Sequence, residues 1–312
     1  MNKVLFGDCR ETLKTIDVKA RMCVTSPPYY GLRDYGGEKN QIGQEDTPEE
    51  FINNLVDVFR SVRDVLTDDG TLWVNIGDSY YNYRPGKGQA LVKQTLSSTE
   101  RDQPQDCPRR GNKLEGLKEK DLIGIPWMLA FALRADGWYL RQDIIWHKPN
   151  PMPESVRDRC TKSHEYLFLL SKNRKYYYDN EAIKEPVKQD WGTRDRSQGK
   201  YHNEGTGLQP HSGLEKSYTK RNKRSVWSIT NKPYKGAHFA VFPPDLIEPC
   251  ILAGSEQGDV VLDPFMGSGT TAMVAKKYNR NYIGCELHED YASLQTDRID
   301  SIPTPLPAII WK

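Results

Sequence analysis

The stretch Val260–Glu286, VVLDPFMGSGTTAMVAKKYNRNYIGCE, decides the fold of this chain. It opens with the apolar run Val260–Leu262, which predicts a buried strand. A glycine-containing loop follows, and then Thr270–Lys277, for which we expect a helix. The second apolar run, Tyr282–Cys285, predicts the next strand. A strand, a helix and another strand in this order indicate neighbouring parallel strands of an α/β sheet.

The loop inside this stretch has the composition of a ligand-binding turn. It reads Asp-Pro-Phe-Met-Gly-Ser-Gly-Thr-Thr at residues 263–271. Glycines let a ligand approach the backbone closely, and the following helix N-terminus offers free N–H groups. Glu286 lies 23 residues beyond Asp263, where nucleotide-binding α/β folds place a carboxylate for ribose hydroxyls. A tight turn plus a surface glutamate is the alternative, but the two features together favour a site. The spacing departs from the GxGxxG of dinucleotide sites.

The rest of the chain extends this pattern on both sides. Strands are predicted at Lys3–Phe6, Arg21–Thr25 and Thr71–Ile76. A helix is predicted to begin after Thr47, whose hydroxyl can cap it, and to end at Asp69-Gly70. The other expected elements are a helix over Leu122–Ala135, strands over Tyr139–Trp146 and Tyr166–Leu170, and helices over Leu246–Leu252 and Tyr291–Ile299. The predicted fold class is α/β, with a doubly wound, mostly parallel sheet.

Composition and length fit a globular protein of this kind. Of 312 residues, 37% are hydrophobic and 28% are charged, which argues against a disordered chain. The longest weakly charged apolar stretch, Leu122–Leu133, contains Gly124 and Pro126 and is too short to span a membrane. The N-terminal residues lack a signal-peptide pattern, and the six cysteines are scattered without a CxxC pair. We therefore expect a cytoplasmic protein with reduced thiols, no membrane association and no metal site.

The net charge of +2 hides two basic segments. Residues 181–235 hold twelve basic and six acidic side chains, and residues 84–120 hold nine basic and five acidic ones. The remainder of the chain is therefore acidic. Basic segments on an acidic body suggest a polyanionic partner such as nucleic acid, with solvated surface as the alternative.

A second motif, Thr-Ser-Pro-Pro-Tyr-Tyr at residues 25–30, ends an early predicted strand. Its two prolines fix their own φ angles and stiffen the segment. The hydroxyl of Ser26 and backbone carbonyls can accept hydrogen bonds from an amino group, and Tyr29 can stack on a planar base. From the residues alone, a rigid turn carrying a core aromatic is an equally good interpretation.

The two motifs together resemble those of a known enzyme family. TSPPYY is similar to the (S/D/N)PP(Y/W/F) catalytic motif of amino-methyltransferases that act on DNA, and DPFMGSGTT is similar to their S-adenosylmethionine loop. The catalytic motif comes first, which resembles the circularly permuted β class. The resemblance covers nearly all of residues 1–180 and 225–300. It implies a Rossmann-like fold with an inserted target-recognition region, S-adenosyl-L-methionine as cofactor and double-stranded DNA as substrate.

The resemblance also implies a domain organisation. Residues 1–180 would form the catalytic half, with a basic loop at 82–120, and residues 225–312 the cofactor-binding half. The segment 181–224 lies where the family inserts its target-recognition region. The later strands of the catalytic half are matched by Trp73–Asp78, Ile145–Pro151 and His164–Lys172.

Residue by residue, the resemblance assigns three groups. The catalytic group is Ser26, Pro27, Pro28 and Tyr29. The cofactor-binding group is Asp8, Thr25, His238, Phe242, Pro243, Asp263, Pro264, Phe265, Gly267, Ser268, Gly269, Thr270 and Glu286. The DNA-binding group is Lys220, Arg221, Lys223 and Arg224.

The target base follows from the first position of the catalytic motif. Serine there favours N4 of cytosine, whereas aspartate would favour N6 of adenine. The alternatives are N6-adenine methylation, methylation of RNA or protein, and a DNA-binding protein without activity. The permuted order and the basic insertion argue against RNA and protein, and the intact motifs argue against inactivity. We also expect a prokaryotic or phage-encoded enzyme, with a second copy of itself and a restriction enzyme as candidate partners.

Overall fold

The computed structural model describes residues 2–31, 41–81, 114, 116–187, 219–231 and 242–303. Within these ranges an eight-stranded sheet has the strand order β1-β10-β9-β2-β3-β5-β4-β8. Its strands are β1 (Lys3–Phe6), β2 (Ala20–Thr25), β3 (Leu66–Ile76), β4 (Tyr139–His147), β5 (His164–Ser171), β8 (Val226–Ser228), β9 (Val260–Asp263) and β10 (Asn281–Glu286). Strand β5 runs antiparallel to β3 and β4, and the other pairs in this sheet are parallel. The predicted mostly parallel α/β sheet is confirmed.

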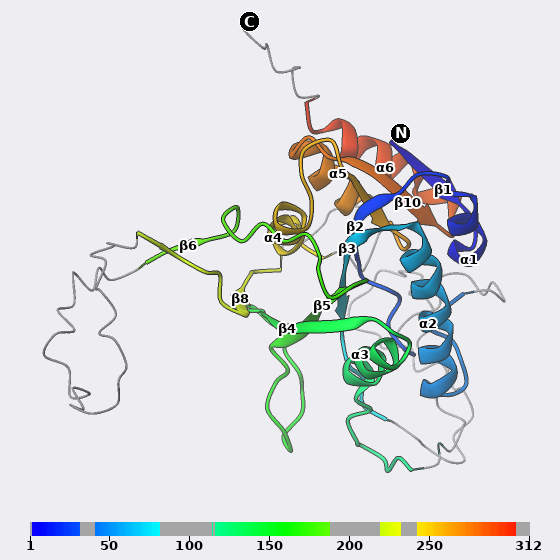
Figure 1. Cartoon of the computed structure of the whole chain (residues 1–312). Coiled ribbons are helices and arrows are strands. Elements are labelled where there is room, and N and C mark those ends of the chain that lie inside the picture. Colours follow the sequence, from blue (N-terminus) through cyan, green and yellow to red (C-terminus); the bar gives the residue numbers. More distant parts are fainter. Residues whose placement is uncertain are drawn as a thin grey trace, which may run out of the picture.

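Helices cover both faces of the sheet (Figure 1). They are α1 (Cys9–Thr12), α2 (Pro48–Val65), α3 (Ile125–Ala135), α4 (Pro244–Gly254), α5 (Thr270–Lys277) and α6 (Ala292–Asp300), with 3-10 turns at Leu13–Thr15 and Glu289–Tyr291. Buried side chains of α1, α2 and α3 form one apolar core, and those of α4, α5 and α6 form the other. The layers are therefore helix, sheet and helix.

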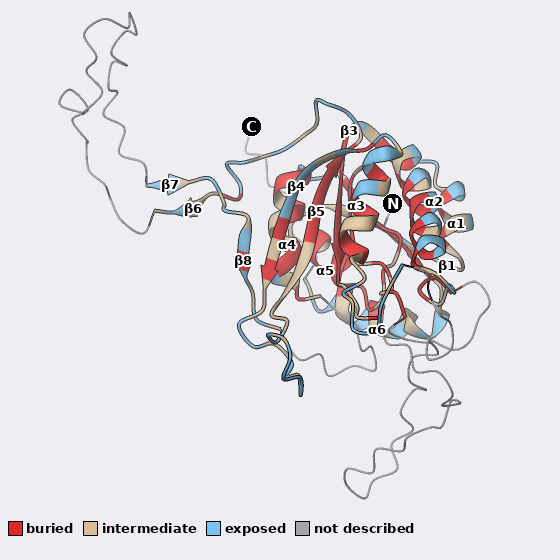
Figure 2. Ribbon diagram, turned by 90° about the horizontal axis from the view of Figure 1, so that it is seen from below, coloured by how far each residue is buried: buried red, intermediate tan, exposed pale blue. Residues whose placement is uncertain are grey.

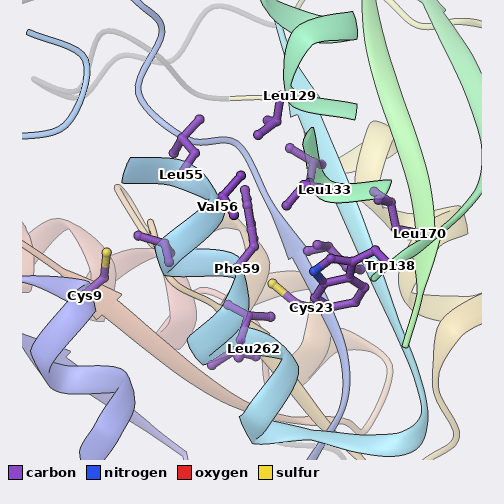
Figure 3. Packing of buried hydrophobic residues seen from close by; sticks show 14 of the residues in the cluster. Cys9, Cys23, Leu55, Val56, Phe59, Leu129, Leu133, Trp138, Leu170 and Leu262 are labelled. Atoms are coloured by element: carbon purple, nitrogen blue, oxygen red, sulfur yellow. The ribbon is translucent and has the colours of Figure 1, made fainter. Parts of the chain in front are cut away.

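The sequence of the central strand explains this arrangement. Side chains of a strand alternate between its two faces, and in β2 Cys23 joins the first core while Met22 and Val24 join the second. Figure 3 shows the first core, where Phe59 of α2 and Leu133 of α3 lie with Cys23 among the buried side chains. Since apolar residues occupy both faces, β2 is buried on both sides, as expected of a central parallel strand.

Two predicted helix boundaries are wrong. Helix α2 ends at Val65 and Leu66 is already extended, so the Asp69-Gly70 pair lies inside β3 instead of ending the helix. Asp69 forms an ion pair with Arg21 of β2, and the β2–β3 register shifts beside it. This contact between strands overrides the local turn signal of Asp-Gly.

Helix α3 begins at Ile125, three residues after the predicted start. Gly124 has φ +88°, a left-handed conformation outside the α-helical region. Pro126 then occupies the first turn, where its missing N–H has no cost. Leu122, which was expected to belong to the helix, is half exposed, at 50%.

The chain order of the sheet matches a permuted fold. The N-terminal strand β1 pairs with β10, near the other end of the chain. A short antiparallel ribbon, β6 (Glu185–Pro186) with β7 (Lys220–Arg221), projects from the body of the sheet (Figure 2). The predicted loop at 82–120 lies almost wholly outside the described residues, as do residues 188–218 of the predicted insertion. None of the helices described is long and apolar enough to cross a membrane.

Candidate active site

The candidate site lies along one edge of the sheet. The carboxyl ends of β1, β10, β9, β2, β3 and β4 meet there, together with the first residues of the antiparallel β5. Strand β9 leads outward to β10, whereas its neighbour β2 leads to β3 on the other side. The two connections therefore run in opposite directions from neighbouring strands. This place is the topological switch point of the sheet, where open α/β sheets bind ligands. Both sequence motifs, residues 25–30 and 263–271, begin at this point.

Asp263 joins the two motifs. Its carboxylate accepts hydrogen bonds from the hydroxyls of Thr25 and Thr271, both at 2.6 Å, and from the N–H of Phe265 at 3.0 Å. Burial of this side chain, which is 1% exposed, raises the pKa of Asp263 to about 6. Thr25 is fully buried as well. Both residues were predicted to bind cofactor, and the geometry gives them a positioning role behind the loop.

The loop at residues 263–271, predicted from the sequence to bind cofactor and hereafter called the cofactor loop, is held on its other side by Glu286. The N–H of Gly267 donates to Glu286 Oε2 at 2.8 Å, and the N–H of His288 donates to Oε1 at 3.1 Å. Burial raises the pKa of the Glu286 carboxyl. Gly267 and Phe265 keep intermediate exposure, whereas Pro264, Ser268, Gly269 and Thr270 are buried. The exposed part of the predicted cofactor site is therefore the turn at Phe265 and Gly267, beside Glu286.

Helix α6 packs against this loop. Gln295 Nε2 donates to the carbonyl of Gly267 at 2.7 Å, and Arg298 Nη1 donates to Ser268 Oγ at 2.6 Å. Gly269 has φ +82°, and a Cβ at this position would lie 3.3 Å from Gln295 Cα. Glycine is required here both for its conformation and for the close approach of α6.

Asp8 lies on the neighbouring strand end. The preceding residue, Gly7, donates its N–H to the carbonyl of Glu286 at 2.8 Å, which places Asp8 beside the cofactor loop. Its carboxylate caps α1 through the N–H of Arg10 at 2.9 Å and binds the Arg10 guanidinium. Burial acts to raise the pKa of Asp8, but the hydrogen bonds and charge of Arg10 outweigh it and lower the pKa.

The catalytic motif occupies the opposite side of the switch point. Ser26, Pro28 and Tyr29 keep intermediate exposure, and Pro27 is buried. The Tyr29 hydroxyl donates to Glu165 Oε2 at 2.7 Å and reaches Asn75 Oδ1 at 3.4 Å. Its ring lies close to the backbone of Gly77. The structure thus brings the catalytic group and most of the cofactor group to one edge.

Three predicted cofactor residues belong to the segment before α4. Pro243 is buried and precedes the first residue of the helix, and Phe242 packs against the second core. His238 lies outside the described residues.

The four predicted DNA-binding residues lie away from this edge, on β7 and the turn after it. Two of them are engaged by an acidic neighbour, since Arg221 Nε and Arg224 Nε donate to Glu185 Oε1 at 3.0 Å and 2.6 Å. Lys223 Nζ lies 4.9 Å from the ring centroid of Trp227. Lys220 and Arg221 are therefore part of the projecting ribbon, and Lys223 and Arg224 follow shortly after it. Contact of these four residues with DNA stays a prediction.

Sequence reasoning missed the side chains that support the motifs. Asn75, Lys148 and Glu165 stand behind Tyr29, and Gln295 and Arg298 stand behind the cofactor loop. Asn75 lies in the predicted strand Thr71–Ile76, whereas Lys148 and Glu165 lie outside the predicted strands, in the segments 145–151 and 164–172 that the family resemblance matched. The two on α6 carried no sequence signal, because a polar residue on a surface helix is ordinary.

The mostly parallel α/β sheet with both motifs at its switch point has the architecture of an S-adenosylmethionine-dependent methyltransferase. A family model described as DNA methylase, for N6 and N4 methyltransferases, matches residues 20–297. The chain therefore belongs to this DNA methylase family.

Named relatives agree with that assignment. The chain is 49% identical to the Type II methyltransferase M.SmaI of Serratia marcescens, over 95% of this chain and 90% of the relative. It is 47% identical to the Type II methyltransferase M.Cfr9I of Citrobacter freundii, over 96% and 87% of the two chains.

Solved structures share the fold. The PvuII DNA methyltransferase, cytosine-N4-specific by its title, matches with a TM-score of 0.61 at 18% identity, over 99% of this chain and 88% of that one. A putative DNA modification methylase from Thermus thermophilus, solved in complex with S-adenosyl-L-methionine, matches with a TM-score of 0.59 at 24% identity, over 97% and 95%.

Proposed function

We propose that this protein transfers a methyl group from S-adenosyl-L-methionine to N4 of a flipped cytosine in double-stranded DNA. The observation that carries the proposal is the position of Ser26. It follows Thr25, whose hydroxyl is bonded to Asp263 of the cofactor loop at 2.6 Å. A hydroxyl that can accept a hydrogen bond from the target amine therefore stands directly beside the loop expected to hold the methyl donor.

The residues at the edge fit the cofactor. Glu286 offers a carboxylate of the kind that binds ribose hydroxyls, beside a glycine turn whose backbone a ligand can approach. Asp8 would lie near the adenine, and Phe242 in the segment before α4 would flank the methionine end of the cofactor. When bound, S-adenosyl-L-methionine supplies an electrophilic methyl group.

The chain's own residues act on the target amine. An exocyclic amine is a weak nucleophile because its lone pair is delocalised into the ring. The Ser26 hydroxyl and the Pro27 carbonyl accept hydrogen bonds from its two N–H groups. These bonds favour a pyramidal nitrogen with its lone pair aimed at the methyl carbon. The nitrogen–carbon bond forms as the carbon–sulfur bond breaks, and one amino proton leaves to solvent. Much of the acceleration comes from positioning, with Tyr29 stacked on the flipped base.

Serine at the first motif position supports cytosine over adenine. N6-adenine methylation is the second candidate, because both chemistries occur in this family. We further propose that residues 181–224 recognise the target sequence, that residues 1–180 and 225–312 form the catalytic and cofactor halves, and that the enzyme is cytoplasmic. A homodimer and a companion restriction enzyme are the partners to be tested.

The deciding experiment measures transfer of tritiated methyl groups to DNA, RNA and protein in parallel, followed by nucleoside analysis of the labelled product. N4-methylcytosine in DNA supports the proposal, and N6-methyladenine overturns the choice of base. Ser26→Ala should slow single-turnover transfer about tenfold to a hundredfold, for the loss of one hydrogen bond in a dry site. Ser61→Ala, on the exposed side of α2, is the matched control and should leave the rate unchanged. Equal rates for the two variants would remove Ser26 from the mechanism.

A further inference from the structure

Behind the catalytic motif, a chain of polar contacts crosses four neighbouring strands. Tyr29 follows β2, Asn75 lies in β3, Glu165 in β5, and Lys148 follows β4. The sheet places these strands side by side in the order β2-β3-β5-β4. The contacts therefore join the catalytic motif to a strand three positions away along the same edge.

Glu165 is the centre of this chain. Its Oε2 accepts the Tyr29 hydroxyl at 2.7 Å and the Asn75 amide at 3.3 Å, and its Oε1 binds the Lys148 ammonium. Asn75 is itself fixed, since its amide also donates to the carbonyl of Tyr166 at 3.0 Å. The carboxylate thus has two donors besides the tyrosine, one in β3 and one directly after β4.

The ion pair is largely withdrawn from water. The side chains of Lys148 and Glu165 are 16% and 15% exposed, and the Lys148 ammonium lies 4.2 Å from the ring centroid of Trp146. Desolvating two charges is costly unless each keeps its partners, so removal of one leaves the other unsatisfied. Such a pair holds its geometry more firmly than an exposed one.

The Tyr29 ring is confined on its other side by backbone. A Cβ placed on Gly77 would lie 2.6 Å from Tyr29 Cε2 and 3.1 Å from Cδ2. The absence of a side chain at Gly77 therefore makes room for the ring. Packing against Gly77 and the hydroxyl bond to Glu165 therefore restrict the orientation of the ring.

We propose that Glu165, held by Lys148, is a positioning residue that fixes the Tyr29 ring as a preformed stacking platform for the flipped base. The inference rests on the proposed function, because it assigns Tyr29 the contact with the base. Fixing the platform before the base arrives avoids the entropic cost of ordering a free ring upon capture. Glu165 acts through Tyr29 and does not touch the reacting atoms.

The test is a double-mutant cycle with Tyr29→Phe and Glu165→Gln. The substrate is a duplex that the wild-type enzyme methylates, and both single-turnover rate at saturating DNA and S-adenosyl-L-methionine affinity are measured. Each single variant should slow transfer about tenfold to a hundredfold, in line with one hydrogen bond to a charged group. Cofactor affinity should stay within about twofold of wild type, because the cofactor loop makes none of these contacts.

Non-additivity separates positioning from a general structural role. In the Tyr29→Phe background, Glu165→Gln should slow transfer by less than about threefold further, since the bond it serves is already gone. Gly77→Ala, which pushes on the ring without changing a charge, should reproduce the slow phenotype. Tyr178→Phe, away from the motif edge, and Glu248→Gln, which breaks the ion pair with Lys277, are controls expected to match wild type.

Fully additive effects, or a Tyr29→Phe variant as fast as wild type, would overturn the inference. If Glu165→Gln alone fails to fold, Tyr29→Phe and Gly77→Ala still decide it. A wild-type enzyme that methylates no DNA refutes the proposed function instead, so the two failures are distinct.

Discussion

Replacement of Thr25 by valine tests whether the two motifs are joined through Asp263. The substitution exchanges the hydroxyl for a methyl group at a site that is fully buried. It therefore removes the 2.6 Å hydrogen bond to Asp263 Oδ1 with little change in packing volume. The carboxylate keeps Thr271 and the Phe265 N–H but loses one of its three donors.

The expected loss of unfolding free energy follows from the charge of the acceptor. A hydrogen bond to a charged group contributes about 1.5–3 kcal/mol, and a neutral one about 1 kcal/mol. Since the pKa of Asp263 is about 6, the carboxylate is ionised at pH 7.5 and largely protonated at pH 5. Thr25→Val should therefore cost about 2 kcal/mol at pH 7.5 and about 1 kcal/mol at pH 5.

Urea denaturation followed by circular dichroism at the two pH values measures this cost. Thr271→Val removes the equivalent 2.6 Å bond to Asp263 Oδ2 from the helix side and should behave in the same way. Thr296→Val is the matched control on the exposed face of α6, where the hydroxyl bonds only within its own helix, and should change stability by less than about 0.5 kcal/mol.

A Thr25→Val cost below about 0.5 kcal/mol at both pH values would refute the reasoning, because a buried bond to a carboxylate cannot be so weak. A cost that is large but independent of pH would assign it to packing and not to Asp263.

Three further predictions concern Asp263, the packing of Gly284 under the cofactor loop, and the lysines near the β6–β7 ribbon. In Asp263→Asn the titrating group is gone. Because the folded pKa of about 6 exceeds the ordinary value of 3.8, protonation of Asp263 stabilises the wild type below the ordinary pKa, and this stability is lost as the pH rises through 6. The stability of the wild type relative to the variant should therefore fall by about 2 kcal/mol between pH 4 and pH 7 in denaturation curves. Gly284→Ala places a Cβ 2.2 Å from Met266 Cε and 2.9 Å from its Cγ. Overpacking should lower the free energy of unfolding by about 1–3 kcal/mol and weaken cofactor binding measured by calorimetry. Unchanged cofactor affinity would show that the loop absorbs the shift. Neutralising Lys220 and Lys223 should lower the slope of log DNA affinity against log salt concentration by about one per lysine. Cofactor affinity is the internal control. An unchanged slope would show that these lysines lie on solvated surface that does not contact DNA.

The stretch Val260–Glu286 was predictable because its information is local. Its apolar runs and glycine turn place β9, α5 and β10 within a residue of the observed bounds. The end of α2 was not predictable, because Leu66 is extended within a strand that pairs with β2, and Asp69 binds Arg21 from that distant segment. Turn propensity describes only the neighbours in sequence.

The same limit applies to the site. Ser26 and Tyr29 could be named from their motif, but Glu165 could not. Its contact with Tyr29 depends on β5 entering the sheet between β3 and β4, and strand order is a property of the whole chain. The motif resemblance supplied the predicted catalytic residues, and the tertiary fold supplied the side chains that contact them.

The pairing of β1 with β10 has a consequence for how the enzyme is made. During synthesis residues 3–6 leave the ribosome long before residues 281–286, which form the strand they pair with. Contacts of such long sequence separation form late, because a long loop must close before they contribute. The Asp8 side of the predicted cofactor site, which is joined to Glu286 through Gly7, therefore assembles only after β10 has been translated.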